Sequence, residues 1–208
     1  NEVNCIFKDE KGFLWFGTRS GLNRFDGYRF KTFKHDLRDT TSINDEEIEQ
    51  IFEGPNHKLW INTKSGLVIY DLLKEKFNRH PQTSLKALGV PDASLLDLKK
   101  DHQGNFWLLG ATTGLYKYEP GTGKTVHYLS EPTASVNITG FAISDSNFIW
   151  AIYNNGLLKK MDGTSGKTLD SSIIVPGQKA AAELTAYEIY SDAQDDLWIF
   201  SPGRPRGI

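Results

Sequence analysis

The fold is decided by a stretch near the N-terminus, DEKGFLWFGTRSGL at residues 9–22. An aspartate, a glycine turn, an apolar-Trp pair and a Gly-Leu pair follow one another in it, and the tryptophan then recurs every 43 to 48 residues. The five tryptophans are Trp15, Trp60, Trp107, Trp150 and Trp198. Repeats of about 40–50 residues are typical of solenoids and propellers.

The residues around each tryptophan recur as well. An aspartate stands six residues before three of them: Asp9, Asp101 and Asp192. A Gly-Leu pair follows each of the first four: Gly21-Leu22, Gly66-Leu67, Gly114-Leu115 and Gly156-Leu157. Since every tryptophan belongs to the pattern, we interpret it as a structural repeat of the whole chain.

Each repeat has room for four short strands joined by turns. In the first repeat, Asp9 and Gly12 favour a tight turn, because aspartate bonds its own backbone and glycine accepts positive φ. The sequence predicts an all-β chain: a β-propeller of four-stranded antiparallel blades, incomplete, with four blades and part of a fifth. The expected blades span residues 1–41, 42–92, 93–135, 136–183 and, in part, 184–208.

The tryptophans are expected to be packing residues between blades, because a residue found in every repeat usually fills the core. Stacking on a sugar is the alternative for them. The residue after each tryptophan is never aspartate, which excludes the Trp-Asp repeat, and the chain contains no Gly-Gly pair, which argues against kelch.

Composition excludes several classes of function. The 208 residues carry a net charge of -2, so they lack the basic excess of a nucleic-acid-binding protein. No catalytic motif, phosphate loop or metal-binding spacing is found, and we expect no catalytic residue, no metal and no cofactor. Three histidines, His35, His80 and His127, each follow a tryptophan by twenty residues, but outer strands of neighbouring blades diverge too far to share a zinc ion.

The binding site is expected where the turns between second and third strands meet the connections between blades, since loops there vary without disturbing the blades. Donors suited to sugar hydroxyls or acidic sugars gather on that face. The candidate ligand-binding residues are Arg19, Arg38, Lys64 and Asn154. The alternative interpretation is that these residues are solvated turns.

The first repeat resembles the two-component regulator propeller repeat. The similarity rests on Ile6, Asp9, Gly12, residues 14–18 and residues 21–28; the second repeat keeps much of the pattern. The third repeat inserts one residue, and the fourth lacks the Gly-Thr pair. The resemblance therefore covers the whole chain, most specifically at its beginning.

The resemblance implies the opening part of a periplasmic sensor domain in a hybrid two-component system. Such a sensor implies an oligosaccharide ligand, the remaining blades, a second propeller and a homodimer. Membrane tethering, a histidine kinase and any contact with nucleic acid would belong to parts outside this chain. A propeller-fold lyase or glycosidase, and a plain protein-interaction scaffold, remain the alternatives.

Overall fold

The computed structural model describes residues 2–91, 94–128, 136–174 and 186–200. The chain divides into two compact parts, residues 1–98 and 99–208, and each is described by itself. Within the described ranges, no helix is both long and apolar enough to cross a membrane.

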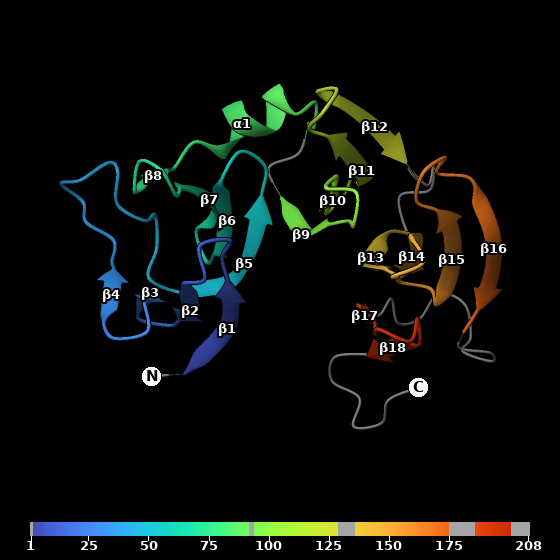
Figure 1. The fold of residues 1–208 in the computed structure, drawn as a ribbon, viewed down its shortest axis with the longest axis horizontal. Helices are drawn as coiled ribbons and strands as arrows, with labels where there is room; N and C mark the ends of the chain where they lie inside the picture. Colours follow the sequence, from blue (N-terminus) through green and yellow to red (C-terminus); the bar gives the residue numbers. More distant parts are fainter. Residues whose placement is uncertain (1, 92–93, 129–135, 175–185, 201–208) are drawn as a thin grey trace. The chain divides into compact units, whose positions relative to one another are not determined.

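The first part holds two four-stranded antiparallel sheets (Figure 1). The first sheet consists of β1 (Val3–Lys8), β2 (Leu14–Thr18), β3 (Gly21–Phe25) and β4 (Phe30–Phe33). The second consists of β5 (Ile48–Gly54), β6 (Lys58–Thr63), β7 (Gly66–Asp71) and β8 (Lys76–Asn78). In both sheets the strands pair in chain order, so each repeat forms its own sheet.

The second part continues the same pattern. Its sheets consist of β9 (Leu95–Lys100, at the boundary between the parts), β10 (Phe106–Gly110), β11 (Gly114–Glu119) and β12 (Lys124–Tyr128), then β13 (Ile138–Ile143), β14 (Phe148–Tyr153), β15 (Leu157–Asp162) and β16 (Thr168–Ile173). A final pair, β17 (Glu188–Ser191) and β18 (Leu197–Phe200), begins a fifth sheet. The predicted all-β fold of four four-stranded blades and part of a fifth is confirmed.

One short helix, α1 (Pro81–Ala87), has no counterpart in the predicted strands. It follows β8 and occupies the connection between the second and third blades (Figure 1). Proline at its first position suits a helix start, and Pro81 and Leu85 are its buried residues. Seven residues with two buried side chains give too weak a helical period to stand out in the sequence.

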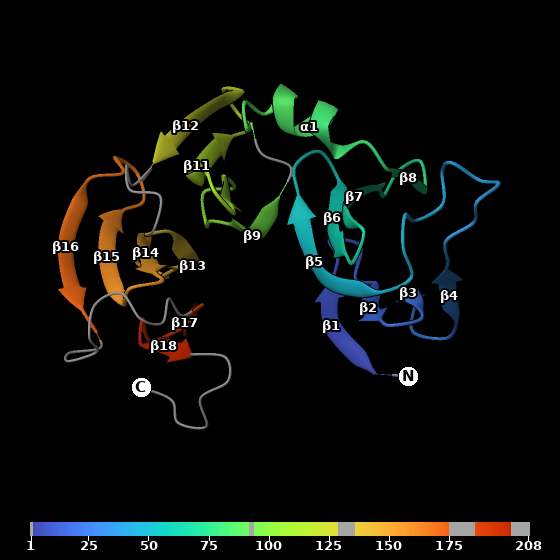
Figure 2. The ribbon, with the colours of Figure 1, turned by 180° about the vertical axis from the view of Figure 1, so that it is seen from behind.

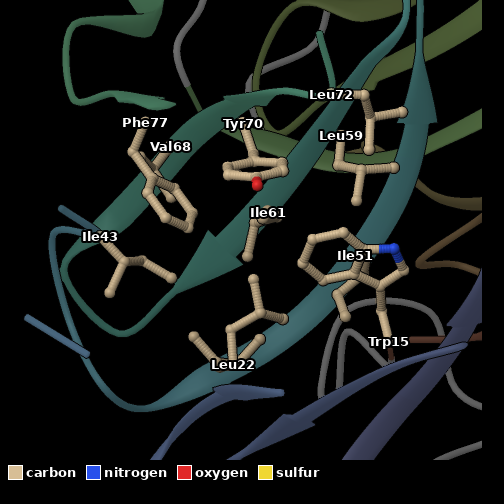
Figure 3. Packing of buried hydrophobic residues seen from close by; sticks show 11 residues of the cluster. Trp15, Leu22, Ile43, Ile51, Leu59, Ile61, Val68, Tyr70, Leu72 and Phe77 are labelled. Carbon is tan, nitrogen blue, oxygen red and sulfur yellow. The ribbon is translucent and has the colours of Figure 1, made fainter. Parts of the chain in front are cut away.

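Trp15 forms the centre of the packing between the first two sheets. Strand β5 lies beside β1 and β2 in both views (Figures 1 and 2). The Trp15 ring is fully buried, stacks on Phe33 with centroids 5.6 Å apart and meets the edge of Tyr70 at 5.3 Å. Figure 3 shows Trp15, Leu22, Ile61 and Tyr70 directed toward one another, so the tryptophan acts here as the predicted packing residue.

A hydrogen bond from indole to aspartate recurs in three blades. Nε1 of Trp15 donates to Asp9 Oδ2 at 2.8 Å, and the equivalent bonds are 3.0 Å from Trp107 to Asp101 and 2.9 Å from Trp198 to Asp192. The same carboxylate also orders the preceding turn: Asp9 Oδ1 accepts the backbone N–H groups of Lys11 and Phe13. The aspartate therefore connects the turn to the inter-blade packing.

The second blade departs from this arrangement. Gly54 replaces the aspartate there, and the buried Nε1 of Trp60 has no hydrogen-bond partner among the described residues. A side chain at Gly54 would meet Trp60 directly, because an added Cβ would lie 2.1 Å from the indole. The Trp60 ring thus occupies the space that the aspartate fills in the first, third and fifth blades.

The first blade exposes a face that the second blade buries. Ile6 and Phe30 are 64% and 63% exposed, whereas the matching residues Ile51 and Phe77 are 8% and 7% exposed against Trp15. The 208-residue chain should therefore self-associate through this apolar face. Light scattering should show oligomers of the wild-type chain and smaller species of the Phe30→Glu variant. A monodisperse wild-type monomer would contradict the prediction.

Candidate ligand-binding loop face

In the first part of the chain, three connections meet at one end of the two sheets. They are the turn 18–21 between β2 and β3, the turn 63–66 between β6 and β7, and the connection 34–47 that joins β4 to β5. We refer to these three segments as the loop face. Because both sheets are antiparallel, the remaining turns lie at the opposite end.

The end of the connection, residues 44–47, bonds to both turns. The N–H of Gly21 donates to Glu46 O at 2.8 Å, and the N–H of Lys64 donates to Glu47 O at 3.0 Å. Asn44 Nδ2 donates to Gly66 O at 3.2 Å. These backbone and amide bonds hold the two turns in a fixed arrangement, so the side chains between them have a rigid base.

The charged side chains of the loop face are arranged in pairs of opposite sign. Lys64 Nζ lies 2.9 Å from Glu47 Oε2, and Arg19 Nε lies 3.3 Å from Glu2 Oε2. The hydrogen bond to Glu47 raises the pKa of Lys64 above its usual value. Both cations remain exposed, at 68% and 64% of their side chains, so they can still reach a ligand.

The Ser65 hydroxyl and the Asp45 carboxylate lie beside the Lys64–Glu47 pair. Ser65 Oγ donates to Asp45 Oδ2 at 2.6 Å, and this hydrogen bond is the largest cause that lowers the pKa of Asp45 below its usual value. Asp45 therefore stays ionised and adds an acceptor next to the donor of Lys64. The sequence predicted cationic donors at this face, but the acidic partners were not identified from it.

The other two candidate residues have different surroundings. Arg38 is exposed in the connection 34–47, where its backbone N–H donates to Asp36 Oδ1 at 2.8 Å. Asn154, in the second part, is only 8% exposed, and its Oδ1 accepts the N–H of Asn137 at 3.3 Å. The ligand-binding role predicted for Asn154 stays a prediction; in the structure its side chain bonds to the residue just before β13 of its own blade.

Arg79, which the sequence analysis does not single out, is extensively bonded to the connection 34–47. Its Nε donates to Ser42 O at 2.8 Å, and its Nη2 lies 2.9 Å from Asp39 O and 3.1 Å from Asp36 O. Since its contacts are with backbone oxygens of a loop about forty residues earlier, no local sequence signal could have revealed them.

Two of the three histidines that follow a tryptophan by twenty residues, His35 and His127, bond to backbone oxygens of nearby loops. His35 Nδ1 lies 2.8 Å from Ile43 O and must donate to it, because a carbonyl oxygen only accepts. His127 Nε2 contacts Thr113 O at 2.6 Å, and its ring stacks on Tyr116. Across the described ranges, no group of three or more His, Cys, Asp or Glu residues is placed to hold a metal ion.

At the opposite end of the sheets, Glu75 joins the first two blades. Its Oε1 lies 2.8 Å from Arg24 Nη1 and its Oε2 lies 2.8 Å from Lys31 Nζ. The Arg24 guanidinium also covers the Phe13 ring at 4.6 Å. The hydrogen bonds from Lys31 and Arg24 lower the pKa of Glu75 to about 2.

This shift predicts a contribution to stability that acid removes. Because the folded-state pKa is depressed, the contribution is complete above the usual carboxyl pKa of about 4.3 and is lost as the pH falls through about 2. In thermal unfolding, the melting temperature of wild type should exceed that of Glu75→Gln near neutral pH. The two melting temperatures should converge toward pH 2. A gap that stays constant down to that pH would contradict the prediction.

The first strands of the chain match a known protein family. Residues 1–20 match the model of the family described as two component regulator propeller. The match confirms the resemblance found in the sequence, and it includes the Asp9–Trp15 bond and Arg19 of the loop face.

A curated relative is similar to this chain over a longer stretch. "Histidine kinase P4" from Formosa agariphila is 48% identical over 44 residues, which are 21% of this chain and 3% of that protein. The chain thus spans a small fraction of the curated relative that it matches.

Two solved structures share the fold of this chain. The extracellular domain of BT3049 from B. thetaiotaomicron, described as a hybrid two component system, has a TM-score of 0.62 at 23% identity, over 97% of this chain and 27% of that one. The extracellular domain of BT4673 from the same organism has a TM-score of 0.54 at 14% identity, over 97% of this chain and 33% of that one. Both confirm the propeller fold.

Proposed function

We propose that this chain is part of the extracytoplasmic sensor propeller of a two-component system. On this proposal it resides in the periplasm, and its loop face binds an oligosaccharide from polysaccharide breakdown without converting it. The family match, the similarity to a histidine kinase over 44 residues and the extracellular domains that share the fold all support a sensor module.

The observation that carries the ligand class is the pairing of donors with acceptors on the loop face. A sugar hydroxyl both donates and accepts hydrogen bonds, so it is satisfied best by one group of each kind. Lys64 and Glu47 supply such a pair 2.9 Å apart, and Ser65 and Asp45 lie beside them. Because both turns are held by backbone bonds, the pairs need little further ordering when a ligand binds.

Calorimetric titration of the complete sensor domain would test this proposal. The panel should contain neutral hexose and pentose oligomers and uronic acid oligomers. We expect saturable binding of one class, weakened about tenfold in Lys64→Ala through loss of a charge-assisted hydrogen bond worth roughly 1.5–3 kcal/mol. Stability should change by no more than about 0.5 kcal/mol, because the substituted side chain is exposed.

Lys74→Ala is the matched control. Lys74 is an exposed lysine in the turn between β7 and β8, at the opposite end of the same sheet, so its loss should leave the affinity unchanged. Equal affinity of wild type, Lys64→Ala and Arg19→Ala would place the site elsewhere. No saturable heat from any oligomer would refute the ligand class, and shortened oligomers in a chromatogram would indicate an enzyme.

A further inference from the structure

The loop His35–Ile43, which makes up most of the connection 34–47, folds back on itself. The N–H of Asp36 donates to Ser42 Oγ at 2.9 Å, and the N–H of Ser42 donates to Asp39 O at 3.1 Å. The N–H of Thr41 donates to Asp39 Oδ1, and this carboxyl has a lowered pKa because the Thr41 hydroxyl and N–H bond to it. The loop is therefore compact, although it has no strand or helix.

Carbonyl oxygens of this loop converge on one side chain. The guanidinium of Arg79 contacts four of them: Asp36 O at 3.1 Å, Asp39 O at 2.9 Å, Ser42 O at 2.8 Å and Ile43 O at 3.2 Å. It also donates to the Ser42 hydroxyl. Arg79 itself directly follows β8 of the second blade, so one residue ties the loop to that blade.

A backbone bond strengthens the same attachment. The N–H of Phe77, in the outer strand β8, donates to Thr41 O at 3.0 Å. Phe77 is 7% exposed and packs on Tyr70 at 4.7 Å, so its position is fixed by the core. The loop thus rests on a rigid strand, and Arg79, at the end of that strand, contacts five oxygen atoms of the loop.

We propose that Arg79 is a positioning residue of the loop face. It holds His35–Ile43 in a single conformation. It thereby sets the position from which Arg38, at the exposed tip of that loop, contacts a ligand. The inference rests on the proposed function in so far as it concerns the ligand; the hold on the loop is independent of it. Arg79 acts here through the loop, since its Nε and Nη2 donate to loop oxygens.

Hydrogen exchange measured by mass spectrometry tests the hold on the loop. In the sensor domain with Arg79→Ala, amides of residues 36–42 should exchange at least about tenfold faster, because local opening no longer breaks the guanidinium bonds. Arg79→Lys should give an intermediate rate, since an ammonium cannot reach the same set of oxygens. Millimolar ethylguanidinium should slow exchange again in Arg79→Ala only.

Arg29→Ala is the control, because Arg29 is an exposed arginine in the turn between β3 and β4, away from the loop. It should leave exchange at residues 36–42 unchanged. Unchanged exchange in Arg79→Ala would overturn the proposal. Faster exchange that spreads equally through β5–β8 would also overturn it, because Arg79 would then be a general structural residue.

Titration with the best-binding oligomer of the panel above tests the positioning role. Affinity should fall at least about tenfold in Arg79→Ala and return with ethylguanidinium, in parallel with the exchange rate. Full affinity with a loosened loop would refute positioning but leave the proposed function intact. Absence of binding by the wild-type domain would refute the proposed function, while the exchange result would still decide whether Arg79 holds the loop.

Discussion

Replacing Trp15 by alanine should lower the free energy of unfolding of the 208-residue chain by about 3–5 kcal/mol. The ring is fully buried between two sheets and contacts Phe33 and Tyr70, so its removal leaves a cavity that those rings cannot close. It also leaves the buried Asp9 carboxylate without its indole donor. Urea unfolding followed by tryptophan fluorescence and circular dichroism measures the loss.

Trp198→Ala is the matched control for this prediction. It removes the same residue at the same position of the repeat, with the same bond to an aspartate, but its ring is 54% exposed. We expect a cost of about 1 kcal/mol or less, because little packing is lost. Equal costs at the two sites would contradict the assignment of the tryptophans as inter-blade packing residues.

Replacing Asp101 by alanine should cost about 3 kcal/mol, because several donors lose a charged acceptor inside the fold. Its carboxylate accepts the N–H groups of Gln103 and Asn105 and the indole N–H of Trp107. Burial raises the pKa of Asp101, but the hydrogen bonds from Trp107 and Asn105 outweigh it and leave this pKa below its usual value. Urea unfolding of Asp101→Ala, compared with wild type, gives the cost.

Two further variants serve as controls: Asp101→Asn removes the charge but keeps an acceptor, and Asp192→Ala removes the equivalent aspartate of the fifth blade. Asparagine keeps one acceptor oxygen, so its cost should fall below that of alanine. Asp192 makes the same bonds at the exposed tryptophan, and its loss should cost much less. If Asp101→Ala proves neutral, then the repeated Asp-Trp bond does not stabilise the blades.

The periodic part of the fold could be predicted because its signals are local and repeated. Asp9 and Gly12 define a turn by their own backbone preferences, and the tryptophan spacing sets the length of the blade. The sequence does not show which cations cover the Trp15 and Trp107 rings. Arg24 and Lys117 stand opposite Trp15 and Trp107 across adjacent strands, a pairing that depends on strand register.

The candidate site was only partly predictable for the same reason. Turns with exposed Arg19 and Lys64 follow from the repeat, so the end of the sheets that carries them could be named. Glu47, Asn137 and Arg79 approach their partners from other segments of the chain, and no spacing rule predicts such contacts. Burial of Asn154 likewise depends on its long-range bond to Asn137.

The proposed function requires a ligand to bind at the loop face. Hydrogen exchange of the complete sensor domain, with and without the oligomer that binds best in calorimetry, tests that claim most directly. We predict slower exchange in residues 34–47 and 63–66, with the Trp15 and Trp60 strands unchanged. Slower exchange confined to the turns at the opposite end, residues 9–12 and 55–57, would contradict it.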